Sequence, residues 1–289
     1  MKSILMVFAL MLASGSSGKI LTVDLKPETV AAFEHYVKTA EVRITEEETH
    51  PDAFLYFDSL PTSGRPQVKA SLQHGQISIK KLTVLDASGH AIEAPGGLIH
   101  HWLGILFIPG VSIQPVLGAV QDYAHEQDHY RPQVIRARLI SHQGNEFEIY
   151  LRLQEKKIIT VTLDTEHEVR YSQLDRTRWS SRSYSTRIRE VRNAGEKDEY
   201  LLPVGLDGGF LWRINSYWRF EESDGGVYVQ CESISLTRDI PTGLGWMLEP
   251  FVTSVPRQTL QATLEATRAV VLARHRSNRG PSGYLSRPQ

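Results

Sequence analysis

Residues 125–129 carry a pattern that binds zinc in one class of hydrolytic enzymes. His125, Glu126 and His129 reproduce the H-E-x-x-H spacing, in which two histidines one helical turn apart bind the metal and the glutamate activates water. Such a site needs a long apolar helix and a third ligand. Here the intervening residues are polar, and Pro132 ends any helix within a turn. We therefore expect no metal, and a zinc metallopeptidase is the weakest of three hypotheses.

His100 and His101 are a second pair of residues that could do chemistry. Both precede Trp102 in a predicted β-strand, so their side chains point to opposite faces and cannot act as a pair. One of them can line a cavity as a polar handle, or act as a general base if the protein is an enzyme. The alternative is a histidine at the end of a strand that bonds to the backbone.

The other reactive side chains favour no catalytic role. Asp164 and Glu166 share one strand face but lack an evident buried partner. The sequence shows no nucleophile elbow around a serine and no glycine loop of phosphate-binding form. The single cysteine, Cys231, cannot form an internal disulfide and is expected to be a small buried apolar residue. We expect no catalytic residues and no cofactor.

The charge balance excludes a general nucleic-acid-binding protein. The chain has 32 Lys and Arg against 33 Asp and Glu, whereas nucleic-acid binding needs a basic surface that displaces counterions. Residues 170–192 are locally basic. We interpret them as the solvated outer face of two long strands, and the alternative is a surface for an anionic head group.

The first 18 residues are typical of a signal peptide. Lys2 precedes an apolar stretch at residues 4–13, and small residues follow at 14–18. The stretch is too short for a membrane span, which needs about 20 apolar residues. We therefore expect an exported protein, periplasmic or secreted, with a disordered tail at residues 277–289.

Residues 19–97 are expected to form an N-terminal extension rather than a separate domain, because their apolar content is thin for an independent core. The spacing of apolar residues predicts a helix over residues 27–44. A β-hairpin is expected around His74 and Gly75, with apolar residues on both sides.

From residue 98 onward the pattern predicts about seven strands and one long helix. The strands cover residues 99–108, 134–141, 146–153, 158–169, 178–192, 210–220 and 227–237. A short helical pair, with Ser112 as a cap, separates the first two strands. The turns between later strands are short, so the sheet is antiparallel. The long helix begins near Ser254 and is the only long amphipathic element left to cover the sheet.

This order of elements resembles the helix-grip fold of the START and birch-pollen-allergen superfamily, also called SRPBCC. The segments that carry the resemblance are residues 212–218, 227–236, 240–246 and 255–260, within a START-like domain at 98–276. The resemblance implies an α+β fold in which a curved antiparallel sheet wraps around a long C-terminal helix. It also implies a cavity for a lipid, sterol or polyketide-like molecule, and some relatives are cyclases or hydrolases.

The leading hypothesis is an exported, non-enzymatic binding protein whose partner is a hydrophobic small molecule. The alternative on the same fold is a cyclase- or hydrolase-like enzyme that uses His100 or His101. Against a cavity of either kind stands the possibility that large side chains fill the space between the sheet and the helix. Trp246 lies in a loop that is expected to border the cavity entrance. Its side chain would serve as a gate, touch a membrane transiently, or simply pack under the loop. The expected ligand-lining residues are Trp102, Phe147, Ile149, Leu151, Trp212, Ile214, Trp218, Trp246, Leu260 and Leu264.

Overall fold

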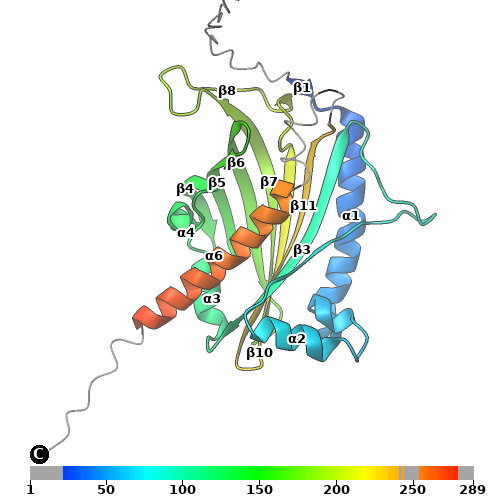
Figure 1. The fold of residues 1–289 in the computed structure, drawn as a ribbon, viewed down its shortest axis with the longest axis vertical. Coiled ribbons are helices and arrows are strands. Elements are labelled where there is room, and N and C mark those ends of the chain that lie inside the picture. Colours follow the sequence, from blue (N-terminus) through cyan, green and yellow to red (C-terminus); the bar gives the residue numbers. More distant parts are fainter. Residues whose placement is uncertain (1–21, 241–242, 244–253, 279–289) are drawn as a thin grey trace, which may run out of the picture.

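The computed structural model describes residues 22–240, 243 and 254–278. The expected signal peptide, the residues around Trp246, and residues 279–289 of the expected tail lie outside the described residues. The predicted α+β helix-grip arrangement is confirmed: a large antiparallel sheet curves around a long C-terminal helix (Figure 1).

The sheet has nine strands in the order β2-β3-β11-β10-β7-β6-β5-β4, with β8 paired to β7. Its strands are β2 (Ser78–Lys81), β3 (Gly97–Pro109), β4 (Val134–Gln143), β5 (Glu146–Lys156), β6 (Thr160–Gln173), β7 (Arg178–Arg192), β8 (Tyr200–Leu201), β10 (Arg213–Ser223) and β11 (Gly226–Arg238). A separate pair joins β1 (Val23–Asp24) to β9 (Leu206–Asp207). Seven strands of the sheet match the predicted ones, β2 lies in the second arm of the hairpin expected around His74 and Gly75, and β8 is an addition.

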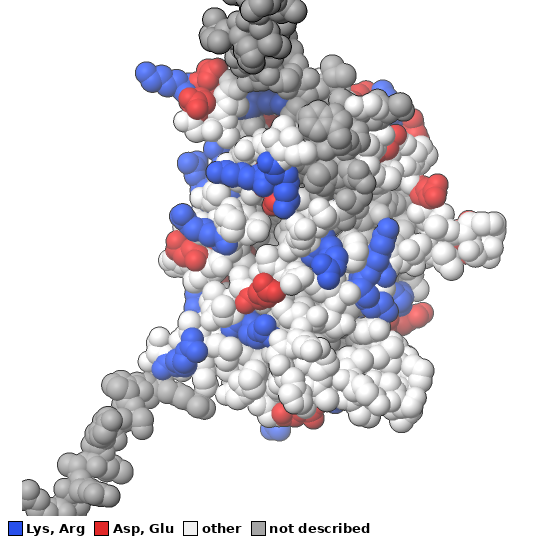
Figure 2. Space-filling view, in the orientation of Figure 1, with Lys and Arg blue, Asp and Glu red and all other residues white. Residues whose placement is uncertain are grey.

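The helices lie on both faces of this sheet (Figure 1). They are α1 (Pro27–Thr49), α2 (Arg65–Gln73), α3 (Ile113–Val120), α4 (Glu126–His129) and α6 (Val255–Asn278). The outward side of α6 carries exposed Arg257, Glu265 and Arg276, and basic and acidic side chains are scattered over this face (Figure 2). Because its other side is apolar, α6 packs that side against the sheet. No described helix is both long and apolar enough to cross a membrane.

The contact between α6 and the sheet depends on a glycine in β3. The inward-facing row Phe220, Val229 and Leu106 is completely buried and belongs to the main core with α3 and α6. In the next row along, β3 contributes Gly104, and the side chains of Leu260 and Leu264 lie directly over it. The missing side chain lets the helix approach the backbone of the sheet closely.

The N-terminal residues form a third layer on the outer face of the sheet. Apolar residues of α1 pack with Tyr217, Ile234 and Leu236 of the sheet. Beneath the helix, the guanidinium of Arg219 is 1% exposed and bonds to the carboxylate of Glu47 at 2.7 Å. Arg219 therefore lies on the outer face of the sheet, away from the cavity, and is ion-paired.

Two local predictions for the extension are wrong. Residues 65–73 form α2 rather than one arm of a hairpin. Val68 and Leu72 are four residues apart, so one helix face accounts for both, and Gly75 with φ of 87° follows the helix end. The first helix also continues to Thr49, beyond the expected end at residue 44.

The N-terminus of α3 is stabilised from another strand rather than by its own cap. Ser112 holds the cap position but its side chain makes no capping hydrogen bond. Instead the backbone N–H of Ile113 donates to the carboxylate of Glu222 on β10 at 2.8 Å. A carboxylate there also suits the positive end of the helix. The prediction of Ser112 as the cap was wrong because it considered only adjacent residues.

The close approach at Gly104 yields a stability prediction. A Cβ at this position would lie 2.5 Å from Cδ1 of Leu264, so Gly104→Ala must displace the buried Leu264 side chain or the helix that carries it, at a cost of about 1–3 kcal/mol. At Gly118 in α3, an added Cβ would meet no heavy atom within 4 Å, so Gly118→Ala should be neutral or stabilising. Urea unfolding measures both variants, and equal stabilities would contradict this account of the helix–sheet contact.

Candidate ligand-binding site

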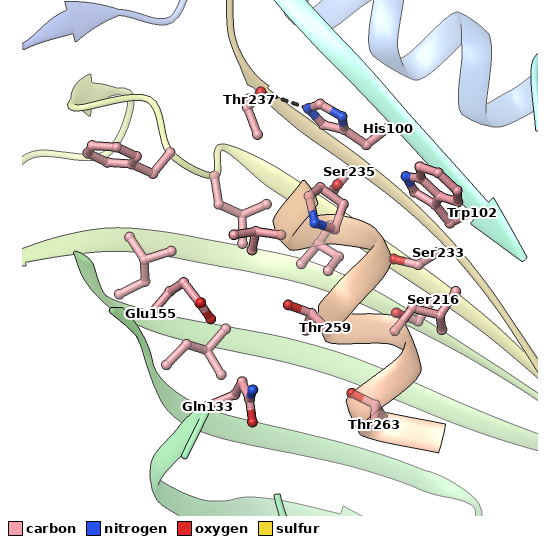
Figure 3. Close-up of a pocket in the computed structure, with 18 of the residues that line it drawn as sticks. His100, Trp102, Gln133, Glu155, Ser216, Ser233, Ser235, Thr237, Thr259 and Thr263 are labelled. Atoms are coloured by element: carbon pink, nitrogen blue, oxygen red, sulfur yellow. Dashed lines mark hydrogen bonds between the residues drawn. The ribbon is translucent and has the colours of Figure 1, made fainter. Parts of the chain in front are cut away.

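A cavity of about 220 Å³ lies between the inner face of the sheet and the first turns of α6 (Figure 3). Three rows of paired residues on β10, β11 and β3 form its floor. The rows are Ile214–Ser235–His100, Ser216–Ser233–Trp102 and Trp218–Cys231–Gly104. Serines occupy positions where the next part of the sheet carries large apolar residues. The space is therefore open because these side chains are small.

The cavity lining differs in chemistry from side to side. An apolar wall consists of Leu153, Val161, Leu163, Phe210, Leu211 and Val255, and Gln133, Gln154 and Glu155 also line the cavity. A polar wall on β3, β10 and β11 consists of His100, Ser216, Ser233, Ser235 and Thr237, and Thr259 and Thr263 come from α6 (Figure 3). A hydrophobic molecule with a polar edge would match both walls, since apolar surface fixes affinity and a few polar groups fix orientation.

His100 is the histidine of the polar wall. It is 8% exposed, and its Nε2 lies 2.9 Å from the hydroxyl of Thr237. Burial, and then the nearby charge of Lys81, lower the pKa of His100 to about 4. The imidazole is therefore neutral near pH 7.

His101 points to the opposite face, which confirms that the two histidines cannot act as a pair. Its Nε2 lies 2.6 Å from the carboxylate of Glu232, and its Nδ1 lies 2.9 Å from the hydroxyl of Tyr36 on α1. The guanidinium of Arg43 bonds to the same carboxylate. His101 is thus part of a buried network that attaches α1 to the sheet.

The structure separates the expected ligand-lining residues into groups. Trp102, Ile214, Trp218 and Leu260 lie on the cavity wall. Leu264, Phe147 and Ile149 belong to the packed core, and Leu151 packs against it. Trp246 lies outside the described residues.

The expectation that Trp212 lines the cavity is wrong. It packs in the outer cluster with α1 residues, and its indole N–H donates to Asp207 at 3.1 Å. The alternation that placed it beside Ile214 begins only at Arg213, where β10 starts. Before that point the chain is irregular and includes Gly209 with φ of 70°, so the period-two rule does not apply.

The sequence reasoning missed most of the polar wall. Ser216, Ser233 and Ser235 alternate with outward-facing residues on two adjacent strands. Small polar residues on the dry face of a strand are a readable signal of unfilled space. The prediction instead selected the large apolar residues, which mark packed core as often as a cavity.

The H-E-x-x-H match does not form a hydrolytic site. His129 Nε2 lies 2.8 Å from the guanidinium of Arg274, a cation at the position where a metal would bind. Burial and the nearby Asp122 raise the pKa of Glu126 to about 8, so its carboxyl is mostly protonated near neutral pH. Among the described residues, no three potential ligands are grouped.

Two further expectations can be compared with the structure. Cys231 is buried on the cavity floor, and burial raises the pKa of its thiol, as expected for a small apolar residue. Asp164 is buried, and its partners are half-buried side chains on the neighbouring strand. Its carboxylate bonds to Arg152 at 2.7 Å and accepts a hydrogen bond from the hydroxyl of Tyr150 at 2.7 Å. Asp164 therefore joins neighbouring strands.

The low pKa of His100 predicts a pH-dependent stability. Between about pH 6.5 and pH 4 the unfolded chain binds a proton at this residue and the folded chain does not. Stability should therefore fall as pH falls through this window, by on the order of 2 kcal/mol from His100. His100→Asn should lose less stability over this range than the wild type in urea unfolding. Replacement of the exposed His90 by Asn is the control, and an unchanged slope in His100→Asn would contradict the prediction.

Comparison with known proteins gives no family model and no curated protein that matches the sequence. Solved structures do align. A STAR-related lipid transfer protein fragment from Xanthomonas axonopodis is 16% identical, covers 66% of this chain and 98% of its own, and has a TM-score of 0.41. Human STARD10 is 8% identical over 76% and 84%, with a TM-score of 0.43. The ZhuI aromatase/cyclase from Streptomyces sp. R1128 is 12% identical over 64% and 99%, with a TM-score of 0.38.

These low identities and scores carry no argument about ligand or reaction. The element order of this chain is the stronger observation: a first long strand, a short helical pair, six antiparallel strands of the main sheet and a long helix against the inner face. By this order the chain has the helix-grip fold of START domains and the birch-pollen-allergen superfamily.

Proposed function

We propose that the protein binds a small hydrophobic molecule in the cavity beneath α6 and does no chemistry on it. The observation that carries this proposal is the combination of an apolar wall with a polar wall around unfilled space. A packed core would have placed large side chains at Ser216, Ser233 and Ser235, as it does in the neighbouring row of Phe220, Val229 and Leu106.

The size of the cavity narrows the ligand class. A dry cavity of about 150 Å³ holds one benzene molecule. On that scale about 220 Å³ suits a fused pair of aromatic rings, on the order of ten non-hydrogen atoms. Among the expected classes, a small aromatic or polyketide-like compound fits this volume better than a whole phospholipid or sterol.

An enzyme on the same fold is the second candidate, and His100 is the residue that favours it. Its imidazole lines the cavity and is neutral. A general base works best with a pKa near the operating pH, so a pKa of about 4 makes His100 a weak base at pH 7. His101 does not support an enzyme, because it lies on the other face in a complete set of hydrogen bonds.

The proposal includes export of the protein by its first 18 residues. The support is the pattern of Lys2 followed by an apolar stretch and small residues. Hydrophobic ligands would then be met in the periplasm or outside the cell.

A cavity-filling variant tests the binding function. Ser233→Leu places an apolar side chain in the middle of the cavity floor, so naphthalene should bind the variant at least about ten-fold more weakly than the wild type. Ser172→Leu, on an exposed position of β6, makes the same chemical change elsewhere and should leave the Kd unchanged. Equilibrium dialysis measures all three proteins, and circular dichroism confirms that each is folded.

Two results would contradict the proposal. One is wild-type protein that binds neither naphthalene nor its hydroxylated analogue 2-naphthol up to their solubilities. The other is equal binding by wild type and folded Ser233→Leu, which would place the naphthalene outside the cavity. Ser216→Val is the milder filling variant if Ser233→Leu does not fold.

A further inference from the structure

We infer that His100 selects ligands that carry a hydrogen-bond donor, so that the cavity takes a hydroxylated aromatic compound rather than a hydrocarbon, ether or ketone of the same shape. The inference rests on the proposed binding function and names the chemical class of its ligand. Its basis is the way in which Thr237 fixes the position of the proton on the imidazole ring.

The hydroxyl of Thr237 has one proton to donate. Its Oγ1 lies 3.1 Å from the carbonyl oxygen of Arg238, to which it donates, and 2.9 Å from Nε2 of His100. The carbonyl can only accept, so both contacts are hydrogen bonds at once only if Thr237 donates to the carbonyl and accepts from His100, and we infer this arrangement. Nε2 therefore carries the ring proton. A neutral imidazole has one donor and one acceptor nitrogen, which makes Nδ1 the acceptor.

The Nδ1 atom of His100 has no hydrogen-bond partner among the described residues, and it is not one of the sealed buried atoms that lack a partner. In Figure 3 the ring lies between Thr237 and Trp102, with only its Nε2 side bonded. His100 is 8% exposed and lines the cavity, and we infer that its unpaired Nδ1 is the atom that a molecule in the cavity reaches.

The neighbouring hydroxyl groups do not discriminate in this way. Glu155 also lines the cavity and its carboxylate can only accept, but that carboxylate is paired with Lys157 at 3.2 Å. Ser233, Ser235 and Thr259 carry hydroxyls, each of which can donate or accept by rotating. They can satisfy a ligand carbonyl as well as a ligand hydroxyl. His100 is the one polar group of the floor whose hydrogen-bonding character is fixed. The positive charge of Lys81 and the burial of the ring disfavour a second ring proton, which keeps Nδ1 an acceptor near pH 7.

Three probes of nearly equal size test the inference at pH 7. They are 2-naphthol, which can donate, 2-methoxynaphthalene, which can only accept, and 2-methylnaphthalene, which can do neither. An acceptor left unpaired typically weakens binding by about ten-fold or more. We expect wild-type protein to favour 2-naphthol over 2-methoxynaphthalene by at least about ten-fold in Kd, and His100→Phe to remove most of that preference.

Two further variants separate selection from general packing. Thr237→Val removes the group that fixes the ring proton, so the preference for 2-naphthol should shrink while 2-methylnaphthalene binds as before. Ser235→Ala removes a neighbouring hydroxyl of the same wall and should leave the ratio of the Kd values unchanged. The ratio within each protein is compared, because this cancels differences in hydrophobicity between the probes.

A measurement on the wild type does not depend on whether variants fold. Ring-nitrogen NMR of His100 should show a proton on Nε2 in the free protein and a shift of the Nδ1 resonance when 2-naphthol binds. A proton on Nδ1, or equal affinity for 2-naphthol and 2-methoxynaphthalene, would overturn the inference while tight binding of all three probes still supported the proposed function. If none of the probes binds, the proposed function fails, and the inference falls with it.

Discussion

The packing of α6 on Gly104 is the constraint on which the rest of the structure depends. Leu260 and Leu264 rest on the backbone of β3 at this point, so one part of the helix is held at the closest distance that the sheet permits. Toward α3 the space fills with large apolar side chains. In the other direction the sheet carries serines, and the same helix covers open space. A single tight contact therefore divides the interior into a packed half, which supplies stability, and a hollow half, which can accept a ligand.

The N-terminal layer supports the cavity side of the interior by packing on the outer face of the sheet. α1 packs on the outer face through Tyr217, Ile234 and Leu236. Under it lie the buried pair of Arg219 and Glu47 and the network of His101 with Tyr36 and Glu232. Buried charges of this kind are costly unless each has its partner, so they restrict how the helix can sit on the sheet. The layer gives the sheet a second core on the side away from the cavity.

The sequence predicts most of the fold and only part of the site. Strand alternation identified seven strands, and amphipathic spacing identified α6, because both signals are local and periodic. The α2 segment was taken for a hairpin because a glycine after Leu72 marks a helix end as readily as a turn. Trp212 was placed on the wrong face because the regular strand begins one residue later. The serines of the cavity were overlooked because the prediction selected the large apolar residues of each dry face and did not compare small residues across adjacent strands. The role of Glu222 at α3 likewise depends on a contact between distant parts of the chain.

The short strand β2 affects how the chain can be shortened from its N-terminus. It pairs with Trp102, Leu103, Gly104 and Ile105 in the middle of β3, and so covers what would otherwise be the border of the sheet. A fragment that began at residue 98 would keep every element of the helix grip but present β3, a long and mostly apolar strand, with free backbone groups along one side. Such a border is a template for pairing between molecules. We therefore expect shortened versions of this chain to aggregate before they lose their secondary structure, an effect that is separate from any ligand.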